Sequence, residues 1–405
     1  MTDTECRPEA GLRPVDPLRD VRVIDLTRIL AGPHATMILG DLGADVVKVE
    51  RPGSGDDTRH WGPPFVGDTA SYFTAVNRNK RSIAIDLKDE RGRDLVYRML
   101  GDADLLVSNF RPGVMDRLGF GQERLADTFP GLICCSITGH GPDDPRAHLP
   151  SFDLVIQAET GLMDLTGQAD GPPTKAGVSI ADELAGLYLV QGVLAALYHR
   201  ERTGEGCAVN IALNEAMLST FTYQGQRHLV GGGTPRRMGN DHPSLVPYGS
   251  YRAADGDLVV GVANEGQWAR FCEAIERPEL TGDARFETNA VRVENRTRLE
   301  GLLRPRLLEC SREFWIAALR AADVPCGLVQ TAAEAIDAEI ALGTGLVVEG
   351  VDGVRMVGSP IQIGGARAPL VRPSPGLGEH TDEVLAELGL SSEQIATLRA
   401  QGVVA

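Results

Sequence analysis

Alternating strand and helix patterns over the first third of the chain are the feature that most constrains its fold. Residues 21–27 (VRVIDLT) are apolar and rich in β-branched side chains, a helix-spaced stretch follows, and residues 45–50 (DVVKVE) have a strand pattern again. Strand patterns recur at 81–87, 104–110 and 131–138, with helical patterns between them. Strands that alternate with helices predict an α/β fold, with a parallel sheet covered by helices on both faces.

The sequence pattern changes twice in the second half of the chain. A long apolar helix is predicted within residues 174–206, and residues 230–247 are basic, irregular and rich in Gly and Pro. A β-hairpin with Asp255-Gly256 in its turn and three helices then predict a smaller α+β domain. The predicted organisation is a large domain (1–225), a linker with a glycine-rich loop (226–247), a small domain (248–335) and a C-terminal return to the large domain (336–405).

Charge and cysteine usage exclude several classes of partner. The net charge of −16 argues against general binding of nucleic acid or of anionic membranes. The seven cysteines are odd in number, scattered and without a C-x-x-C pair, which indicates reduced thiols in a cytoplasmic protein. The polar N-terminus predicts no signal peptide, and the apolar run from Leu184 to Tyr198 is expected to be too short and interrupted to cross a bilayer.

The common catalytic signatures are absent from the sequence. There is no G-x-G-x-x-G after the first strand, no P-loop, no G-x-S-x-G and no H-E-x-x-H, and the eight histidines form no metal-ligand pattern. Their absence argues against a dinucleotide oxidoreductase, a P-loop NTPase, a serine hydrolase and a zinc enzyme.

Asp182 lies at the start of the long apolar helix. Ser179-Ile-Ala-Asp182 fits a capping box, so the carboxylate can simply cap the helix. The alternative is a catalytic role, because a helix N-terminus stabilises negative charge and is expected to keep a carboxylate ionised and nucleophilic. The two interpretations are compatible.

Basic residues follow several predicted strands. Arg51, Lys88, Arg111 and Arg117 lie after strand patterns, and ligands of open α/β sheets bind beyond the carboxyl ends of the strands. Together these cations are suited to phosphate groups. The alternative for each residue alone is a solvated surface charge.

The loop GGGTPRRMGNDHP is a third candidate site. Gly231–Gly233 allow a close backbone approach or a mobile lid, and Arg236, Arg237 and His242 can pair with a carboxylate of a substrate. The alternative is an exposed hinge between domains.

Several longer segments carry a resemblance to a known family. They are VIDLTRILAGPHATMILGDLGADVVKVERPGSGDDTR, YFTAVNRNKRSIAIDLK, NFRPGVMDRLGF, CSITGHG, SFDLVIQAETGLMDLTG, GPPTKAGVSIAD and LGEHTDEVL. Over nearly the whole chain the sequence resembles the class III CoA-transferases, a group that includes formyl-CoA:oxalate and carnitine CoA-transferases and the α-methylacyl-CoA racemases. The resemblance implies a Rossmann-like large domain and a small domain, in a homodimer of two interlocked rings.

The resemblance also implies a mechanism and its residues. Asp182 corresponds to the family's catalytic aspartate, which attacks an acyl-CoA thioester to form an anhydride and then an aspartyl-CoA thioester. No metal or redox cofactor is implied, because CoA enters as a substrate. Trp61 and Tyr72 match aromatic positions near the acyl group. Arg28 departs from the residue of the formyl-CoA:oxalate enzymes. The implied CoA-binding residues are Arg28, Ile29, Leu30, Ala31, Arg51, Ile85, Lys88, Asn109, Phe110, Arg117 and Leu118.

Phe152 separates the transferase interpretation from the racemase alternative. In the racemase branch a histidine precedes the aspartate that matches Asp153, and it serves as the second base. Here that position is Phe152, which cannot carry a proton, and His148 does not match. A non-catalytic acyl-CoA binder is the second alternative, since it needs the cations but not an ionised Asp182.

The loop sequences are most similar to the branch that uses succinyl-CoA and a second dicarboxylate, the succinyl-CoA:glutarate type. Arg236, Arg237 and His242 suit a distal carboxylate, which must be paired when it is buried. The expected partners are therefore an acyl-CoA, a free carboxylic acid and a second copy of the chain. The acceptor acid stays open among glutarate, itaconate, mesaconate, citramalate and malate.

Overall fold

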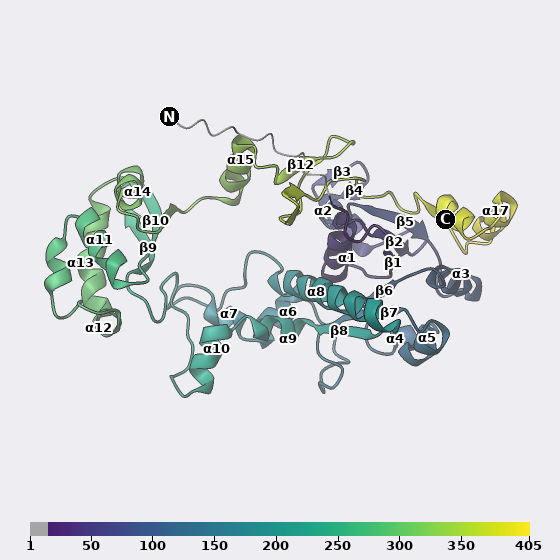
Figure 1. Ribbon diagram of the computed structural model, residues 1–405, viewed down its shortest axis with the longest axis horizontal. Coiled ribbons are helices and arrows are strands. Elements are labelled where there is room, and N and C mark those ends of the chain that lie inside the picture. Colours follow the sequence, from purple (N-terminus) through teal and green to yellow (C-terminus); the bar gives the residue numbers. More distant parts are fainter. Residues whose placement is uncertain (1–14) are drawn as a thin grey trace, which may run out of the picture. The chain divides into compact units, whose positions relative to one another are not determined.

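The computed structural model describes residues 15–405, which divide into two compact units (Figure 1). The first unit holds residues 15–160, 176–226 and 339–405, and the second holds 161–175 and 227–338. Segment 161–175, predicted within the large domain, groups with the second unit. The reason is bonding between residues that are far apart in the sequence, because Gly239 N donates to Gly167 O and Arg237 donates to Asp164.

A six-stranded, all-parallel sheet forms the centre of the first unit. The strand order is β5-β2-β1-β6-β7-β8. The strands are β1 (Arg22–Asp25), β2 (Asp45–Glu50), β5 (Lys80–Ala84), β6 (Leu105–Ser108), β7 (Ile133–Thr138) and β8 (Ala208–Ala212). The prediction of an α/β fold with a parallel sheet is confirmed. The order reverses between β1 and β6, so the ligand-binding position of such a fold lies beyond the carboxyl ends of these strands.

Helices connect the strands, and small elements fill the longer connections. The helices of this part are α1 (Ala31–Asp41), α2 (Ser71–Ala75), α3 (Glu90–Leu100), α4 (Val114–Arg117), α5 (Gln122–Thr128), α6 (Asp153–Glu159), α8 (Ile180–Thr203), α9 (Leu213–Ser219) and α10 (Thr222–Leu229). The 3-10 helix η1 (Asp57–His60) and the hairpin of β3 (Phe65–Val66) and β4 (Thr69–Ala70) lie between β2 and β5. Residues 213–229 hold two consecutive helices, α9 and α10.

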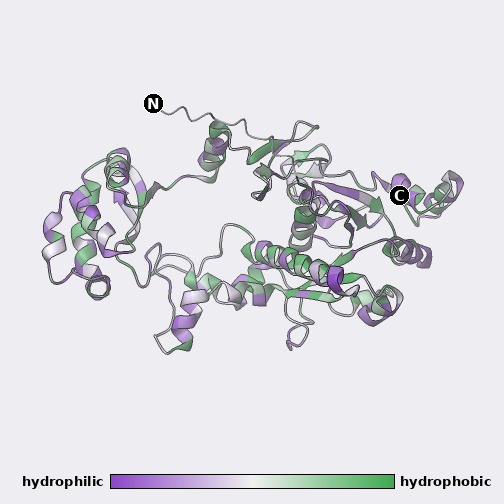
Figure 2. Ribbon diagram, viewed as in Figure 1, coloured by the Kyte–Doolittle hydropathy of each residue, from purple (hydrophilic) through white to green (hydrophobic). Residues whose placement is uncertain are grey.

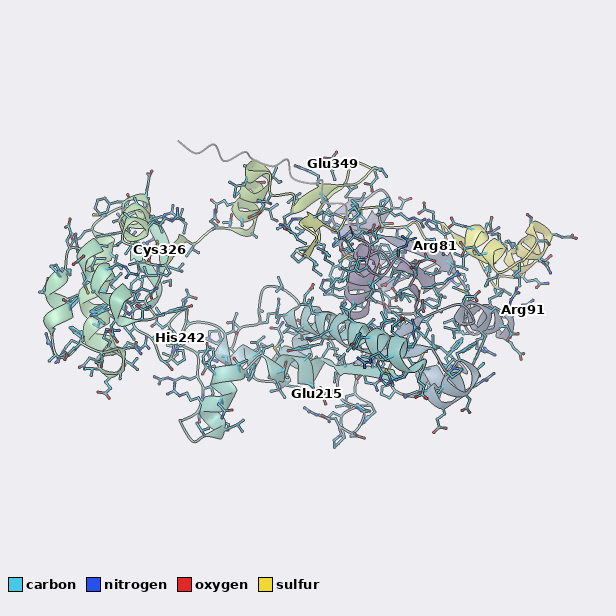
Figure 3. The ribbon with its side chains drawn as sticks, viewed as in Figure 1. Arg81, Arg91, Glu215, His242, Cys326 and Glu349 are labelled. Atoms are coloured by element: carbon cyan, nitrogen blue, oxygen red, sulfur yellow. The ribbon has the colours of Figure 1, made fainter. Side chains whose placement is uncertain are left out.

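The C-terminal segment completes the first unit at its edge strand β5. Helices α16 (Thr381–Glu387) and α17 (Ser392–Ala400) contribute Val384 and Ile395 to the core that lies around β1, β2 and β5. Val404 forms an isolated β-bridge with Ile85. Arg81 on β5, labelled in Figure 3, forms ion pairs with carboxylates of both β2 and α16. Four short strands precede these helices: β12 (Val347–Glu349), β13 (Arg355–Val357), β14 (Gln362–Ile363) and β15 (Ala366–Arg367).

Helix α8 is the longest helix, at 24 residues, and it is strongly apolar (Figure 2). Length and composition alone would allow it to cross a membrane, contrary to the expectation from the sequence. Such a helix is weak evidence for a membrane span, because core helices pass the same test. One face packs against α1, α9, β7 and β8, and Ala185, Leu189 and Val193 are fully buried there.

The second unit is a small antiparallel sheet packed by helices. Its strands are β9 (Tyr248–Ala253), β10 (Gly256–Gly261) and β11 (Cys326–Leu328), and its helices are α7 (Leu162–Leu165), α11 (Glu265–Ala274), η2 (Pro278–Gly282), α12 (Asn289–Glu294), α13 (Arg296–Leu308) and α14 (Arg312–Ala321). Trp268, Phe271 and Trp315 form its core. The hairpin pairs Ala253 with Gly256, so Ala254 and Asp255 form the turn instead of Asp255-Gly256. Helix α15 (Ala332–Leu342) leads out of this unit.

Candidate active site

A cavity of about 430 Å³ opens at the reversal of strand order, beyond the carboxyl ends of β1, β2, β5 and β6. Its lining combines apolar side chains, exposed cations and the buried charged residues Lys48, Glu50 and Asp56. Six of the predicted CoA-binding residues line it: Arg28, Arg51, Ile85, Lys88, Phe110 and Leu118. Arg111, selected from the same strand-end pattern, lines it as well. The parallel sheet brings these residues together because each follows a strand that ends at the same edge.

Four cations at this cavity, Arg28, Arg51, Lys88 and Arg111, are exposed and only loosely paired. Arg28 and Arg51 each lie 3.5 Å from a different oxygen of Asp57, and the Arg28 guanidinium lies 5.4 Å from the ring centre of Phe110. Lys88 and Arg111 are exposed. Cations in this arrangement can bind phosphate oxygens without first breaking a buried ion pair.

The remaining predicted CoA residues do not line this cavity. Ile29, Leu30 and Ala31 continue from Arg28 into helix α1, and Arg117 ends α4. Asn109 is bonded to the protein itself, since its side chain accepts from Arg28 N at 2.9 Å and donates to Arg28 O at 2.6 Å. Asn109 therefore holds the backbone at Arg28.

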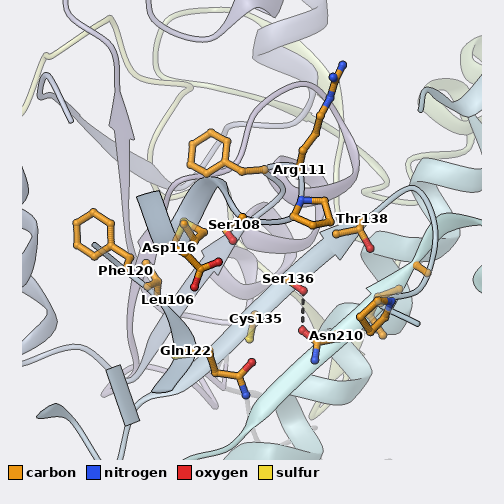
Figure 4. Close-up of a pocket in the computed structure, with 18 of the residues that line it drawn as sticks. Leu106, Ser108, Arg111, Asp116, Phe120, Gln122, Cys135, Ser136, Thr138 and Asn210 are labelled. Carbon is orange, nitrogen blue, oxygen red and sulfur yellow. Dashed lines mark hydrogen bonds between the residues drawn. The ribbon is translucent and has the colours of Figure 1, made fainter. Parts of the chain in front are cut away.

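A second cavity, of about 370 Å³, lies over one face of β6, β7 and β8 (Figure 4). Ser136 donates to Asn210 across its floor at 2.6 Å, and Phe110 and Arg111 line both cavities. No sequence pattern predicted it, because its lining comes from three separate strands. The six cysteines of the described part are free thiols, and Cys134 and Cys135 line this cavity.

Asp182 lies in the first turn of α8, but the predicted capping box does not form. Ser179 is the N-cap residue and its side chain makes no capping bond. Asp153 takes this role from a different helix, because its Oδ1 accepts from Ala181 N at 2.9 Å. Gln157 donates to the other oxygen of Asp153 at 2.6 Å. Asp182 is therefore free of the capping role that the sequence assigned to it.

The electrostatic environment of Asp182 also differs from the expectation. Burial, together with the nearby carboxylates of Asp153 and Glu183, raises the pKa of Asp182 to about 7. From the sequence, the helix N-terminus is expected to keep Asp182 ionised. That expectation is wrong, because desolvation and the neighbouring like charges outweigh the effect of the helix N-terminus on the pKa. A carboxyl group with a pKa this close to neutrality is a common feature of catalytic sites.

Two aromatic residues lie near this carboxyl group, and a histidine lies beside the adjacent Glu183. Tyr72 and Trp61 pack edge to face, with ring centres 5.4 Å apart. Burial and the charge of Asp182 raise the pKa of Tyr72, so its hydroxyl lies near that carboxylate. His34 on α1 places Nδ1 2.8 Å from Glu183 Oε2, without hydrogen-bond geometry. His34 and Glu183 were not predicted, although Glu183 directly follows Asp182.

The predicted substrate residues fall into two groups. Phe152 precedes α6 with an exposed ring, whereas the adjacent Asp153 is buried. Arg236, Arg237 and His242 belong to the second unit (Figure 3 labels His242). Arg236 is exposed, and Arg237 Nη1 donates to Asp164 O and Oδ1.

His242 in the second unit has a defined tautomer. Its Nδ1 accepts from Ser244 N at 3.1 Å. Burial and the charge of Arg296 lower the pKa of His242, which favours the neutral ring.

The first unit thus combines a cationic cavity with a carboxyl group poised near neutral pH. A family model described as CoA-transferase family III matches residues 18–381. The chain belongs to CoA-transferase family III. Its enzyme class and family, both predicted from the sequence, are confirmed.

Similar proteins from distant organisms support this membership. Succinyl-CoA:glutarate CoA-transferase of Mus musculus is 38% identical over 403 residues, which cover 98% of this chain and 92% of that protein. Succinyl-CoA:mesaconate CoA-transferase of Haloarcula hispanica is 40% identical over 397 residues, which cover 93% of this chain and 97% of that protein. A crystal structure of a CAIB/BAIF family protein from Brucella suis matches with a TM-score of 0.82 at 41% identity, covering 92% of this CoA-transferase and 99% of that chain.

Proposed function

We propose that this CoA-transferase moves CoA from succinyl-CoA to a second dicarboxylic acid, with Asp182 as the nucleophile. The observation that carries the proposal is the Asp182 carboxyl group, which has a pKa near 7 in the same unit as the cationic cavity. The names of the mouse and Haloarcula relatives support succinyl-CoA as the donor and a dicarboxylate as the acceptor. No metal ion or redox cofactor is part of this proposal.

The reaction proceeds through two types of acyl intermediate. The Asp182 carboxylate attacks the thioester carbonyl of succinyl-CoA, the C–S bond breaks, and CoA leaves as its thiolate. The thiolate attacks the Asp182 carbonyl of the resulting anhydride, which releases succinate and forms an aspartyl-CoA thioester. The acceptor carboxylate then attacks this thioester, its C–S bond breaks, and CoA again leaves as the thiolate, which gives a second anhydride. The thiolate finally attacks the acceptor's acyl carbonyl, which forms the product thioester and restores Asp182.

The loop of the second unit is proposed to recognise the acceptor's distal carboxylate. Arg236 is exposed and suited to a bidentate ion pair with a carboxylate. Arg237 is held by Asp164, so its proposed role is to orient the loop as well as to add positive charge. His242, with a lowered pKa, is proposed as a neutral hydrogen-bonding group.

Racemase chemistry is disfavoured by the residue before Asp153. Phe152 is exposed and has no titratable group, so it cannot serve as a second base for an α-proton. A purely binding role is disfavoured by the unusual pKa of Asp182, which binding alone does not require.

The active protein is proposed to be a cytoplasmic homodimer of interlocked chains. An apolar stripe of Leu187, Leu194 and Tyr198 is exposed on α8, and these side chains lie seven and four residues apart on one helix face. Large exposed apolar groups in a row are typical of protein interfaces.

Trapping the covalent intermediate tests the proposal. The protein is incubated with succinyl-CoA, treated with hydroxylamine and analysed by intact mass and peptide mapping. We expect a hydroxamate at Asp182, and none in Asp182→Ala. A folded protein that gives no adduct but exchanges the α-proton of a 2-methylacyl-CoA would support the racemase alternative. If the protein gives no adduct and also exchanges no α-proton, the result would support a binding protein.

A further inference from the structure

The turn that links the cationic cavity, the proposed CoA site, to helix α1 has an unfavourable backbone conformation. Ile29 has φ +72°, in the left-handed region that β-branched residues rarely adopt. Strain of this kind persists only where the surrounding structure imposes it, and it is common at functional sites. The turn follows Arg28, which lines the cavity, and precedes α1.

A buried ion pair holds both sides of this turn. Both carboxylate oxygens of Asp56 lie 3.3 Å from Ile29 N, and Asp56 Oδ2 lies 3.0 Å from Lys48 Nζ. The two charged side chains are 0% exposed. Lys48 Nζ also donates to Thr27 O at 2.7 Å. Residues 27 and 29 are thus tied to the same pair of opposite charges.

Other charges near this pair already have partners. Glu50 pairs with Arg59, and its Oε1 accepts from the Ser82 hydroxyl. Asp25 pairs with Lys80. Among the described residues, Asp56 is therefore the carboxylate in direct contact with the Lys48 ammonium group.

The turn also determines where two side chains near Asp182 lie. Ile29 and Leu30 pack in a small apolar cluster with Tyr72. Tyr72 is the residue whose hydroxyl interacts with the charge of Asp182. At the other side of the turn, α1 approaches α8 closely, since a Cβ at Gly186 would lie 2.9 Å from Ala31 O. The turn at Ile29 therefore connects the cavity wall to the surroundings of the carboxyl group.

We propose that Lys48 and Asp56 are positioning residues for CoA transfer, because their ion pair holds the Ile29 turn that directs the thioester from the cavity towards Asp182. This inference rests on the proposed function of Asp182. It concerns the CoA ester and not the free acid, because Lys48 and Asp56 both line the cationic cavity and bond to the turn beside it. Asp56 also caps η1, since its Oδ1 accepts from Thr58 N at 3.0 Å.

A double-mutant cycle tests this role. Glycine adopts positive φ without strain, so the turn of an Ile29→Gly variant no longer needs Asp56. We expect Asp56→Asn to lower kcat/KM for succinyl-CoA at least tenfold with little change in the KM for the acid. In the Ile29→Gly background we expect the same change to cost threefold or less. An equal loss in both backgrounds, or a parallel rise in the acid KM, would overturn the inference.

A second cycle covers the case in which Asp56→Asn does not fold. Asn109→Ala removes the other tie to the same turn and leaves the ion pair intact. The fall in kcat/KM for succinyl-CoA caused by Asn109→Ala is also expected to be smaller in the Ile29→Gly background. Hydroxylamine trapping on the wild-type protein separates the two proposals. If the adduct forms but the paired substitutions act independently in the cycles, only the positioning role is rejected. If the adduct is missing, the proposed function is rejected.

Discussion

At the scale of single residues, the proposed nucleophile was chosen from the sequence, but its environment could not be predicted. Asp182 stands in a recognisable segment, whereas Asp153, which caps α8 and repels Asp182, is 29 residues earlier. The capping box failed because a side chain from another helix replaced the local one. Local spacing cannot reveal such a replacement, since it depends on how α6 and α8 pack.

The raised pKa of Asp182 predicts the pH dependence of the reaction. Only the carboxylate is nucleophilic, so kcat/KM for succinyl-CoA should fall about tenfold per pH unit below about pH 7 and level off above it. Asp153→Asn removes one repelling charge and should move the midpoint to lower pH. A pH–rate profile of both proteins checks this. A wild-type midpoint near 4 would show that the pKa of Asp182 is not raised in the folded protein.

The same pKa shift predicts that Asp182, the proposed nucleophile, reduces the stability of the folded protein. The pKa of Asp182 is about 7 in the folded protein and near 3.8 when unfolded, so the unfolded chain gives up its proton first as pH rises. The penalty is absent below about pH 4, grows from there and is complete above about pH 7. Asp182→Asn should therefore raise the Tm at pH 8 but not at pH 3.5. Equal changes in Tm at both pH values would contradict this account.

At the scale of helices and strands, periodic patterns predicted the large elements well and the short ones poorly. β2 spans residues 45–50 as predicted, and α8 covers most of its predicted segment. The chain at 153–165 folds into α6 and α7, which were not predicted. Helices of seven and four residues show too little of a 3.6-residue period to be recognised.

The close contact of α1 with α8 predicts the effect of a single methyl group. A Cβ at Gly186 would lie 2.9 Å from Ala31 O, a backbone atom that cannot move alone. Gly186→Ala should therefore destabilise the protein by about 1–3 kcal/mol, seen as a lower Tm. Gly301→Ala in α13 is the control, because nothing lies within 4 Å of its Cβ position. The control should be neutral or slightly stabilising, by up to about 1 kcal/mol.

At the scale of the whole molecule, the sequence predicted a large and a small domain, but the place of segment 161–175 depends on contacts between distant residues. Gly167 and Gly239 are bonded across 72 positions, and no local pattern reports such a bond. The cationic cavity was predictable because parallel strands end at one edge. The second cavity and the Ile29 turn were not, because they depend on side chains from separate elements.

The exposed stripe on α8 predicts the response of the proposed dimer to a charge. Leu194→Lys places an ammonium group on this stripe and should produce a monomer in light scattering. Leu308→Lys makes the same change at an exposed leucine of the second unit and should leave the assembly intact. A dimer that survives Leu194→Lys would exclude the stripe from the interface.

The C-terminal segment has a consequence for biosynthesis. Edge strand β5 is synthesised early, but Val404 and α16, which cover it, leave the ribosome only after the entire second unit. For more than 290 residues of elongation, the nascent chain carries an unfinished sheet edge. During this interval a chaperone would have the most exposed sheet edge to protect, and release of residues 381–404 would end it.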